Sequence, residues 1–190
     1  QLNSRIEGTL RIATSASRST PIVQQYLPAF SMKYPSVHFE IYEGLMTNVV
    51  TQLINGSAEL GIANIQMVDI DKFDILLTQE EHLYAIFRRD VFWTDREHDT
   101  ITWEDIKKCP LSLSGGSVRM IMQSSLTDME QLNAVAITTT KSSAIEWASS
   151  GRTVSLVPMD AKELINHRKM ARIKLPEFSG DFKKAFITLK

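Results

Sequence analysis

The sequence predicts an α/β fold in which parallel strands are flanked by helices. Between Gly8 and Asn64, short apolar runs alternate with segments of helical periodicity, and polar residues follow each run. Prolines and glycines separate the segments. Strands that alternate with helices pair in parallel through right-handed crossovers. Because ligands of such sheets bind beyond the carboxyl ends of the strands, the same stretch indicates where a small molecule should bind.

The boundaries of the elements in this first stretch follow from turn and capping residues. Pro21 is suited to open a helix, since the first helical position needs no N–H donor. Pro35 ends that helix at Tyr34, because the residue before a proline disfavours the α region. Asn55 and Gly56 end the next helix. The expected strands lie at 10–13, 37–42 and 59–63, and the expected helices at 21–34 and 49–54.

The rest of the chain predicts a second lobe of the same kind. Strands are expected at 82–87, 111–114, 135–137, 154–157, 171–175 and 182–189, and helices at 103–108, 118–129, 142–150 and 160–166.

An acidic segment before this lobe superficially resembles a calcium-binding loop. It contains Asp69, Asp71, Asp74 and Glu80. However, Phe73 occupies a ligand position, and Asp74 stands where the sharp turn of such a loop requires glycine. We therefore expect an exposed polar connection here.

An ordered set of motifs resembles the effector-binding domain of LysR-type transcriptional regulators. The similarity extends over roughly residues 6–189, and Arg152-Thr153 departs from it where the family commonly has a small residue and a second glycine. The motifs are GTLRI at 8–12, LPAF at 27–30 with Tyr34-Pro35, Glu43-Gly44, LINGSAELGIA at 53–63 and the run from Lys141 to the Leu-Val-Pro that ends at Pro158.

The resemblance implies a two-lobed, type 2 periplasmic-binding-protein-like fold, in which each lobe is a mostly parallel sheet flanked by helices. Lobe I is expected over 1–79, with 1–7 as the end of a linker, and lobe II over 80–190. A winged helix-turn-helix that binds DNA would precede this chain, and a final helix of the family is expected to be missing. The resemblance also implies a cytoplasmic protein that forms a homodimer, and a tetramer at full length.

Composition agrees with a globular domain. The 190 residues are 43% apolar and 23% charged, which is ordinary for a soluble protein. A net charge of −1 gives no reason to expect this segment to bind DNA by itself. The single cysteine, Cys109, excludes an internal disulfide, and the apolar runs are far shorter than the ~20 residues of a membrane span.

Candidate effector-binding residues lie in the turns after the strands. By resemblance, the family's effector-contacting positions fall on Ser15, Ser17, Asn64 and Ser114, and Thr139 and Ser142 are looser matches. Hydroxyl and amide groups suit a small polar metabolite, which includes a small organic acid or another anion. The same hydroxyl residues also serve as helix caps and turn residues, so this alternative stays open.

Three basic residues lie next to these turns, and each is able to pair with a carboxylate. They are Arg18, Arg119 and Lys141. We count Arg18 among the effector-binding candidates, although solvated surface is the more common environment for each of the three.

No pattern for catalysis, metal binding or a cofactor is present. The four histidines are scattered without zinc-ligand spacing, and no serine occupies a Gly-x-Ser-x-Gly elbow. Gly115-Gly116-Ser117 lacks the lysine and the spacing of a phosphate-binding loop, and Cys109 has the character of a small apolar residue.

A methionine-rich segment contains Met120, Ile121, Met122 and Met129. Such a helix face is usually core, and it is also suited to a dimer interface because methionine adapts to irregular partners. The family pairs this helix with the first helix of a neighbouring subunit. The resemblance therefore implies an interface that contains Tyr26, Phe30 and Lys33 of one subunit and Met122 and Met129 of the other.

Three functions remain after this reasoning. The first is an effector-sensing domain that binds a small metabolite in the cleft between the lobes and controls a DNA-binding domain. The second is a solute-binding protein of a transport system, which a secretory signal upstream would distinguish. The third and least favoured is an enzyme on the same fold, because the turns offer mainly serine, threonine and asparagine rather than acid–base groups.

Overall fold

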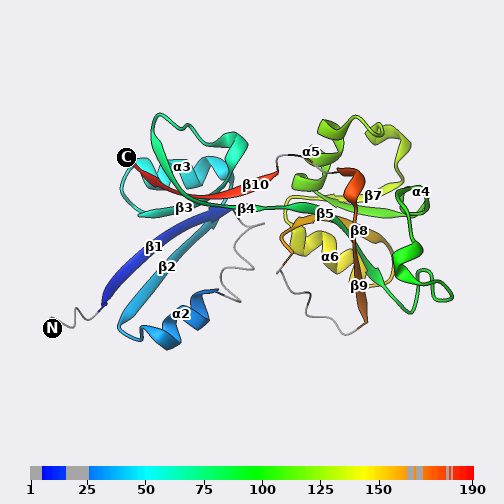
Figure 1. Ribbon diagram of the computed structural model, residues 1–190, viewed down its shortest axis with the longest axis horizontal. Helices are drawn as coiled ribbons and strands as arrows, with labels where there is room; N and C mark the ends of the chain where they lie inside the picture. Colours follow the sequence, from blue (N-terminus) through cyan, green and yellow to red (C-terminus); the bar gives the residue numbers. More distant parts are fainter. Residues whose placement is uncertain (1–5, 16–25, 162–164, 166–168, 179, 181) are drawn as a thin grey trace. The chain divides into compact units, whose positions relative to one another are not determined.

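The computed structural model describes residues 6–15, 26–161, 165, 169–178, 180 and 182–190. The chain divides into two compact units, each with its own five-stranded sheet (Figure 1). Unit 1 comprises residues 1–79 and 183–190, and unit 2 comprises residues 80–182. The expected second lobe comprised all of residues 80–190. The structure differs in that the last strand returns to the sheet of unit 1.

Unit 1 has the strand order β2-β1-β3-β10-β4. β1 pairs in parallel with β2 and with β3, as the alternation of strands and helices predicts, and β10 pairs antiparallel with β3. The strands are β1 (Gly8–Ser15), β2 (Val37–Gly44), β3 (Leu60–Asn64), β4 (Phe73–Glu80) and β10 (Lys183–Leu189).

The expectation of a polar connection over 69–80 is wrong in its second half, because residues 73–80 form the edge strand β4. Its apolar side chains Ile75, Leu76 and Leu77 are exposed rather than alternately buried. A strand without this alternation lacks the period-two signal by which strands are found in a sequence.

Two helices of unit 1 are described, α2 (Leu27–Lys33) and α3 (Met46–Ile54). α2 ends at Lys33, one residue before the predicted end at Tyr34, and its expected start at Pro21 lies outside the described residues. α3 buries Val49 and Leu53 against one face of the sheet. Gly56, which follows the helix, has a φ of +73°, so the predicted glycine stop is confirmed.

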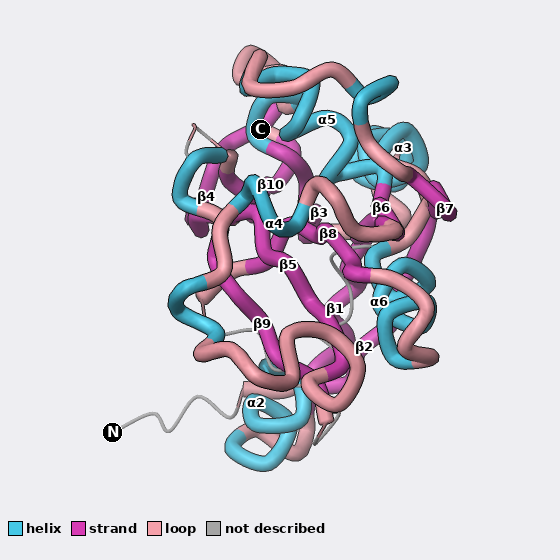
Figure 2. Tube along the Cα trace, turned by 90° about the vertical axis from the view of Figure 1, so that its right-hand side faces the viewer, coloured by secondary structure: helices cyan, strands magenta, loops and turns pink. Residues whose placement is uncertain are grey.

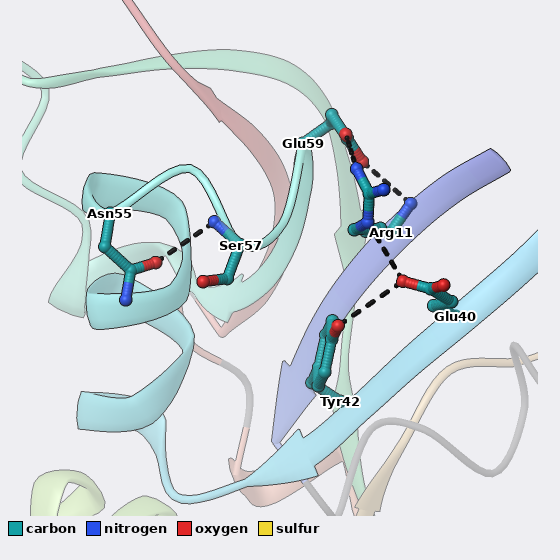
Figure 3. Close-up of polar contacts among 6 residues, drawn as sticks. All are labelled: Arg11, Glu40, Tyr42, Asn55, Ser57 and Glu59. Atoms are coloured by element: carbon teal, nitrogen blue, oxygen red, sulfur yellow. Dashed lines mark hydrogen bonds and ion pairs between the residues drawn. The ribbon is translucent and has the colours of Figure 1, made fainter.

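Arg11, in the middle of β1, links β2 and the residue before β3 through exposed side chains (Figure 3). Its guanidinium donates to Glu40 of β2 at 2.9 Å and to Glu59, just before β3, at 2.9 Å. The backbone N–H of Arg11 also donates to the Glu59 carboxylate, and this bond is the main reason that the pKa of Glu59 is lowered. Tyr42 donates to Glu40 from the same strand.

Unit 2 has the strand order β7-β6-β8-β5-β9. β6 pairs in parallel with β7 and β8, whereas β5 pairs antiparallel with β8 and β9. Figure 2 shows β5 with β8 on one side and β9 on the other. The strands are β5 (His82–Arg88), β6 (Leu111–Ser114), β7 (Ala134–Thr138), β8 (Val154–Met159) and β9 (Met170–Lys174).

The helices of unit 2 are α4 (Trp103–Ile106), α5 (Gly115–Ser124) and α6 (Lys141–Ser149). α5 begins three residues before the predicted start and ends before Met129, because Ser114 caps it at the end of β6 and Ser125 leaves the helix in a left-handed conformation. Met129 belongs instead to a short 3-10 turn, Met129–Gln131. The helix expected over 160–166 lies largely outside the described residues.

Both faces of the unit 2 sheet are covered by apolar side chains. Leu83, Ala85 and Phe87 of β5 join a large cluster with Trp103 of α4 and Ile121 of α5. The alternate residues of β5, Tyr84 and Ile86, join a second cluster with Ala144 and Ala148 of α6. Because side chains alternate across a strand, helices α4 and α5 lie over one face of the sheet and α6 over the other.

Gly61 of β3 leaves no room for a side chain beneath α3. A Cβ at this position would lie 2.5 Å from Cδ1 of Leu53 and 3.1 Å from Cγ1 of Ile187. We expect Gly61→Ala to lower the free energy of unfolding by about 1–3 kcal/mol, the usual cost of overpacking, in urea denaturation. Gly115→Ala is the control, since a Cβ there meets nothing within 4 Å. Equal stability of Gly61→Ala and the unmodified chain would contradict this packing.

Asp105 should make the stability of unit 2 depend on pH. The pKa of Asp105 is lowered to about 2. The largest cause is a hydrogen bond from Arg96, and the next are hydrogen bonds from Thr102. Because the folded-state pKa lies below the unfolded value, the carboxylate stabilises the fold above pH ~4. This contribution is lost as the pH falls toward 2.

We expect Asp105→Asn to lower the free energy of unfolding at pH 7 by about 1 kcal/mol, as for a lost helix cap. The difference from the unmodified chain should shrink between pH 4 and pH 2. Urea titrations at several pH values measure it, and a difference that stays constant over this range would refute the role of the ionised carboxylate.

Candidate functional site

In unit 1, two of the predicted effector-binding residues end neighbouring parallel strands. Ser15 is the last residue of β1, and Asn64 is the last residue of β3. The register between these strands pairs Thr14 with Ile62, so both residues lie at the same carboxyl edge of the sheet. The other two candidates of this unit, Ser17 and Arg18, lie outside the described residues.

The side chains of Ser15 and Asn64 have different local roles. The Ser15 hydroxyl is buried and has no hydrogen-bond partner in the described part of the chain. The Asn64 side chain, which is 5% exposed, accepts a 3.1 Å hydrogen bond from the N–H of Gln66 and so caps the 3-10 turn Ile65–Met67. Asn64 therefore caps a turn with its side chain and also lies at the carboxyl end of β3.

Sequence reasoning missed a buried charged residue beside Asn64. Lys184 of β10 is the antiparallel partner of Asn64 and is 1% exposed. The available signal was the position of Lys184 two residues before Phe186. Side chains two residues apart lie on the same face of a strand, and Phe186 packs against the buried cluster of Ile12 and Ile62.

In unit 2, Ser114 lies at the end of β6 and starts α5. Its hydroxyl accepts a 3.2 Å hydrogen bond from the N–H of Ser117, and the Ser117 hydroxyl accepts a 2.7 Å bond from the N–H of Ser114. This reciprocal pair forms a capping box, and both serines are buried. The Ser114 side chain is thus occupied by the helix start, which is the alternative that the sequence left open.

The turn between β7 and α6 is adjacent to this capping box. The Thr138 hydroxyl lies 3.3 Å from the carbonyl oxygen of Leu113 and 2.7 Å from that of Thr140, which ties the turn to the end of β6. The Thr140 hydroxyl accepts a 3.2 Å bond from the N–H of Ser143 and caps α6. Of the two predicted residues here, Thr139 lies in this turn and Ser142 in the first turn of α6, and both side chains are exposed.

The basic residues of unit 2 differ sharply in their environment. Arg119 is exposed, as expected for a solvated surface residue. Lys141, the first residue of α6, is only 3% exposed, so the expectation of solvated surface is wrong for this residue. Its ammonium lies 3.5 Å from the carbonyl oxygen of Pro158 in β8.

The residues predicted for a dimer interface are partly exposed in each unit. Tyr26 is 40% and Phe30 is 41% exposed, and no residue of α2 is buried. Phe30 contacts the rings of Tyr34 and Phe39, and the Lys33 ammonium lies over the Tyr34 ring.

On the methionine-rich segment, Met122 is 65% exposed, whereas Met120 and Ile121 belong to the core. Met129 packs partly against that core from the 3-10 turn, and so does not share a helix face with Met122. The pairing of these surfaces between subunits stays a prediction.

Other chemical features have structural roles. Asp69 pairs with Lys72 and accepts a bond from the N–H of Asp71, and these contacts lower its pKa. Burial raises the pKa of the Cys109 thiol. Among the described residues, no three histidine, cysteine, aspartate or glutamate side chains are grouped to hold a metal ion. None of the described helices is long and apolar enough to span a membrane.

Comparison with known proteins gives a family match over nearly the whole chain. The model of the LysR substrate binding domain matches residues 3–189. A search of curated protein sequences finds no match.

Solved structures with the same fold include regulators of this family. A variant of the OxyR2 regulatory domain from Vibrio vulnificus has a TM-score of 0.70 at 15% identity, over 98% of this chain and 90% of that chain. The cofactor-binding domain of the Cbl transcriptional regulator has a TM-score of 0.69 at 21% identity, over 95% of this chain and 79% of that chain. CbnR, a LysR family transcriptional regulator, has a TM-score of 0.68 at 18% identity, over 96% of this chain and 64% of that chain.

The two sheets, each with three parallel strands, are the architecture expected of the two-lobed, periplasmic-binding-protein-like fold. The family match covers both of them. The chain therefore belongs to the LysR substrate binding domain family and is the effector-sensing domain of a LysR-type transcriptional regulator.

Proposed function

We propose that this domain binds a small polar metabolite through residues at the carboxyl ends of its parallel strands, and that binding controls the DNA-binding part of the regulator. The contacting residues are Ser15 and Asn64 of unit 1 and Ser114, Thr139 and Ser142 of unit 2, together with Ser17 and Arg18. The family match favours this role over that of a solute-binding protein or an enzyme.

The buried hydroxyl of Ser15 supports this proposal most strongly. A buried polar group without a hydrogen bond costs roughly 1–3 kcal/mol. Within the described ranges the Ser15 hydroxyl is buried without a hydrogen bond, at the strand edge where ligands of α/β sheets bind. A ligand that hydrogen-bonds to this hydroxyl recovers the cost. Ser15 is therefore suited to ligand binding more than to the stability of the fold.

Ser114 supports the same site in a different way. The Ser114 hydroxyl is occupied because it caps α5. Ser114 therefore supports ligand binding by placing the start of α5 at the end of β6. The first N–H groups of an α-helix have no partner within the helix and point toward a ligand at that end. The capping box thus positions donors rather than supplying a hydroxyl.

Regulation by the effector requires two arrangements of the domain with different affinities for the effector. The chain passes twice between the units, near Gln79 and near Phe182. The N–H of Glu81 donates a 2.8 Å hydrogen bond to the carbonyl oxygen of Phe182, so the two connections are joined at the start of unit 2. We infer that these connections transmit the effect of the ligand.

The partners of the complete regulator are part of the proposal. CbnR has been solved at full length in complex with its target DNA, and this chain spans 64% of the length of CbnR. In our proposal the regulator is a cytoplasmic homodimer, and a tetramer at full length. It dimerises through Tyr26, Phe30 and Lys33 against Met122 and Met129, and it binds DNA through a segment outside this chain.

Removal of the hydroxyl in the absence of ligand should destabilise the fold at one of the two serines, Ser114, but not at Ser15. We expect Ser114→Ala to lower the free energy of unfolding by about 1 kcal/mol, because it removes a helix cap. Ser15→Ala should cause no loss, because the Ser15 hydroxyl has no hydrogen-bond partner among the residues that the structure describes. Urea denaturation of both variants measures this, and a destabilised Ser15→Ala would show that Ser15 has a structural role.

Ligand binding can be tested by thermal shift against organic acids, amino acids, sugar phosphates and uncharged sugars and amides. We expect at least one compound to raise the melting temperature in a saturable manner. Calorimetry should then show about tenfold weaker binding to Ser15→Ala, since a lost hydrogen bond of ~1.4 kcal/mol changes affinity by this factor.

Ser31→Ala, in α2 of the same unit, is the matched control and should bind like the unmodified chain. If no compound binds, or if Ser15→Ala binds unchanged, the proposed site is wrong.

A further inference from the structure

We propose that helix α6 has two positions on the sheet of unit 2, one held by a buried hydrogen bond from Ser112 and the other by a hydrogen bond from Ser155. Among the residues that the structure describes, the first bond is formed and the second is not. The inference uses contacts within unit 2 alone. Its regulatory part rests on the proposed function, because the predicted residues Thr139 and Ser142 lie at the start of this helix.

The sheet face beneath α6 carries three buried hydroxyl groups. Ser112 of β6 and Ser155 of β8 are neighbours in the parallel register, and both are 0% exposed. Thr153 is also buried and lies two residues before Ser155, so its side chain is on the same face. The residues that alternate with them, such as Leu113 and Leu156, belong to the apolar cluster on the opposite face.

One of these hydroxyls holds the helix. The Ser112 hydroxyl donates a 2.9 Å hydrogen bond to the carbonyl oxygen of Ala144 in α6, and the Thr153 hydroxyl donates a 2.9 Å bond to Ser112. Ser155 faces α6 as well, since its partner in β5, Ile86, packs with Ala144. The Ser155 hydroxyl has no hydrogen-bond partner in the described part of the chain, which is destabilising for a buried group. A second arrangement, in which Ser155 donates to a carbonyl of α6 in place of Ser112, exchanges one such bond for the other and is therefore close in free energy.

The contacts of α6 with the sheet allow this change of position. The helix buries two small side chains, Ala144 and Ala148, and the long, flexible side chain of Lys141, while Ile145 packs partly against the same cluster. By contrast, α5 buries two large apolar side chains in the core of the opposite face. Neighbouring strands lie ~4.8 Å apart, which is the upper limit of the displacement that α6 needs.

A displacement of α6 links the predicted effector contacts to the outer surface of unit 2. Thr139 precedes the helix and Ser142 lies in its first turn, both with exposed side chains. Trp147, on the same helix, is 41% exposed. A ligand that contacts the first two residues and binds one position of α6 more tightly shifts the population of the two positions, and Trp147 moves with the helix. α6 is thus the two-state element that regulation by an effector requires.

Relaxation-dispersion NMR of the ligand-free domain tests the two positions without an effector. We expect microsecond-to-millisecond exchange at the backbone amides of α6 and at the indole N–H of Trp147. Ser155→Ala should lower the population of the minor position about tenfold, and Ser112→Ala should raise it by a similar factor, the effect of one lost hydrogen bond. Ser124→Ala is the matched control, because this hydroxyl bonds within α5 on the opposite face. It should leave the exchange at α6 unchanged.

Exchange that persists unchanged in Ser155→Ala would overturn the role of Ser155. Absence of exchange at α6 in the unmodified chain and in Ser112→Ala would overturn the two positions. If Ser112→Ala fails to fold, the comparison of the unmodified chain with Ser155→Ala decides alone. A ligand that binds through Ser15 while α6 shows no exchange leaves the proposed function standing without this inference. Exchange at α6 in a domain that binds none of the compounds would support the two positions and count against the proposed function.

Discussion

The free N–H groups at the start of each helix are the constraint on which this domain depends. In a sheet with parallel strands, the residue that ends a strand is followed closely by the next helix, and the first N–H groups of that helix need partners. Ser114 meets this need for α5 and Thr140 for α6. The strand ends are therefore polar for a structural reason, and the same polarity provides hydrogen-bonding groups where a ligand of this fold binds.

This double use explains why the sequence predicted the location of the candidate residues better than their roles. Ser114 has the character of a binding serine in the sequence, but its hydroxyl is occupied by the capping box. Ser15, at the equivalent end of β1, has a buried hydroxyl with no partner in the described part of the chain. The two serines are alike in sequence context, and only the three-dimensional contacts separate a cap from a group that is available to a ligand.

The elements were predictable where the local pattern agrees with the tertiary environment. β6 was predicted with its observed bounds, because apolar and hydroxyl side chains alternate between two buried faces. β4 was missed, because its exposed apolar residues lack a periodic pattern. The first turn of α5 was missed because Gly115 and Gly116 have low helix propensity, whereas the close approach of Gly116 to Pro158 requires glycine there. The burial of Lys141 was equally unpredictable, since it depends on a tertiary contact, in which the ammonium reaches the carbonyl oxygen of Pro158 in β8.

The most direct test of the central claim is a titration of the isotope-labelled domain with a ligand found by thermal shift, followed by two-dimensional NMR of the backbone amides. The account predicts that the largest shift changes occur at the strand ends and helix starts, at Ser15, Asn64, Gly115 and Lys141. Changes concentrated on the exposed strand β4 or on α2, with the strand ends unaffected, would contradict it.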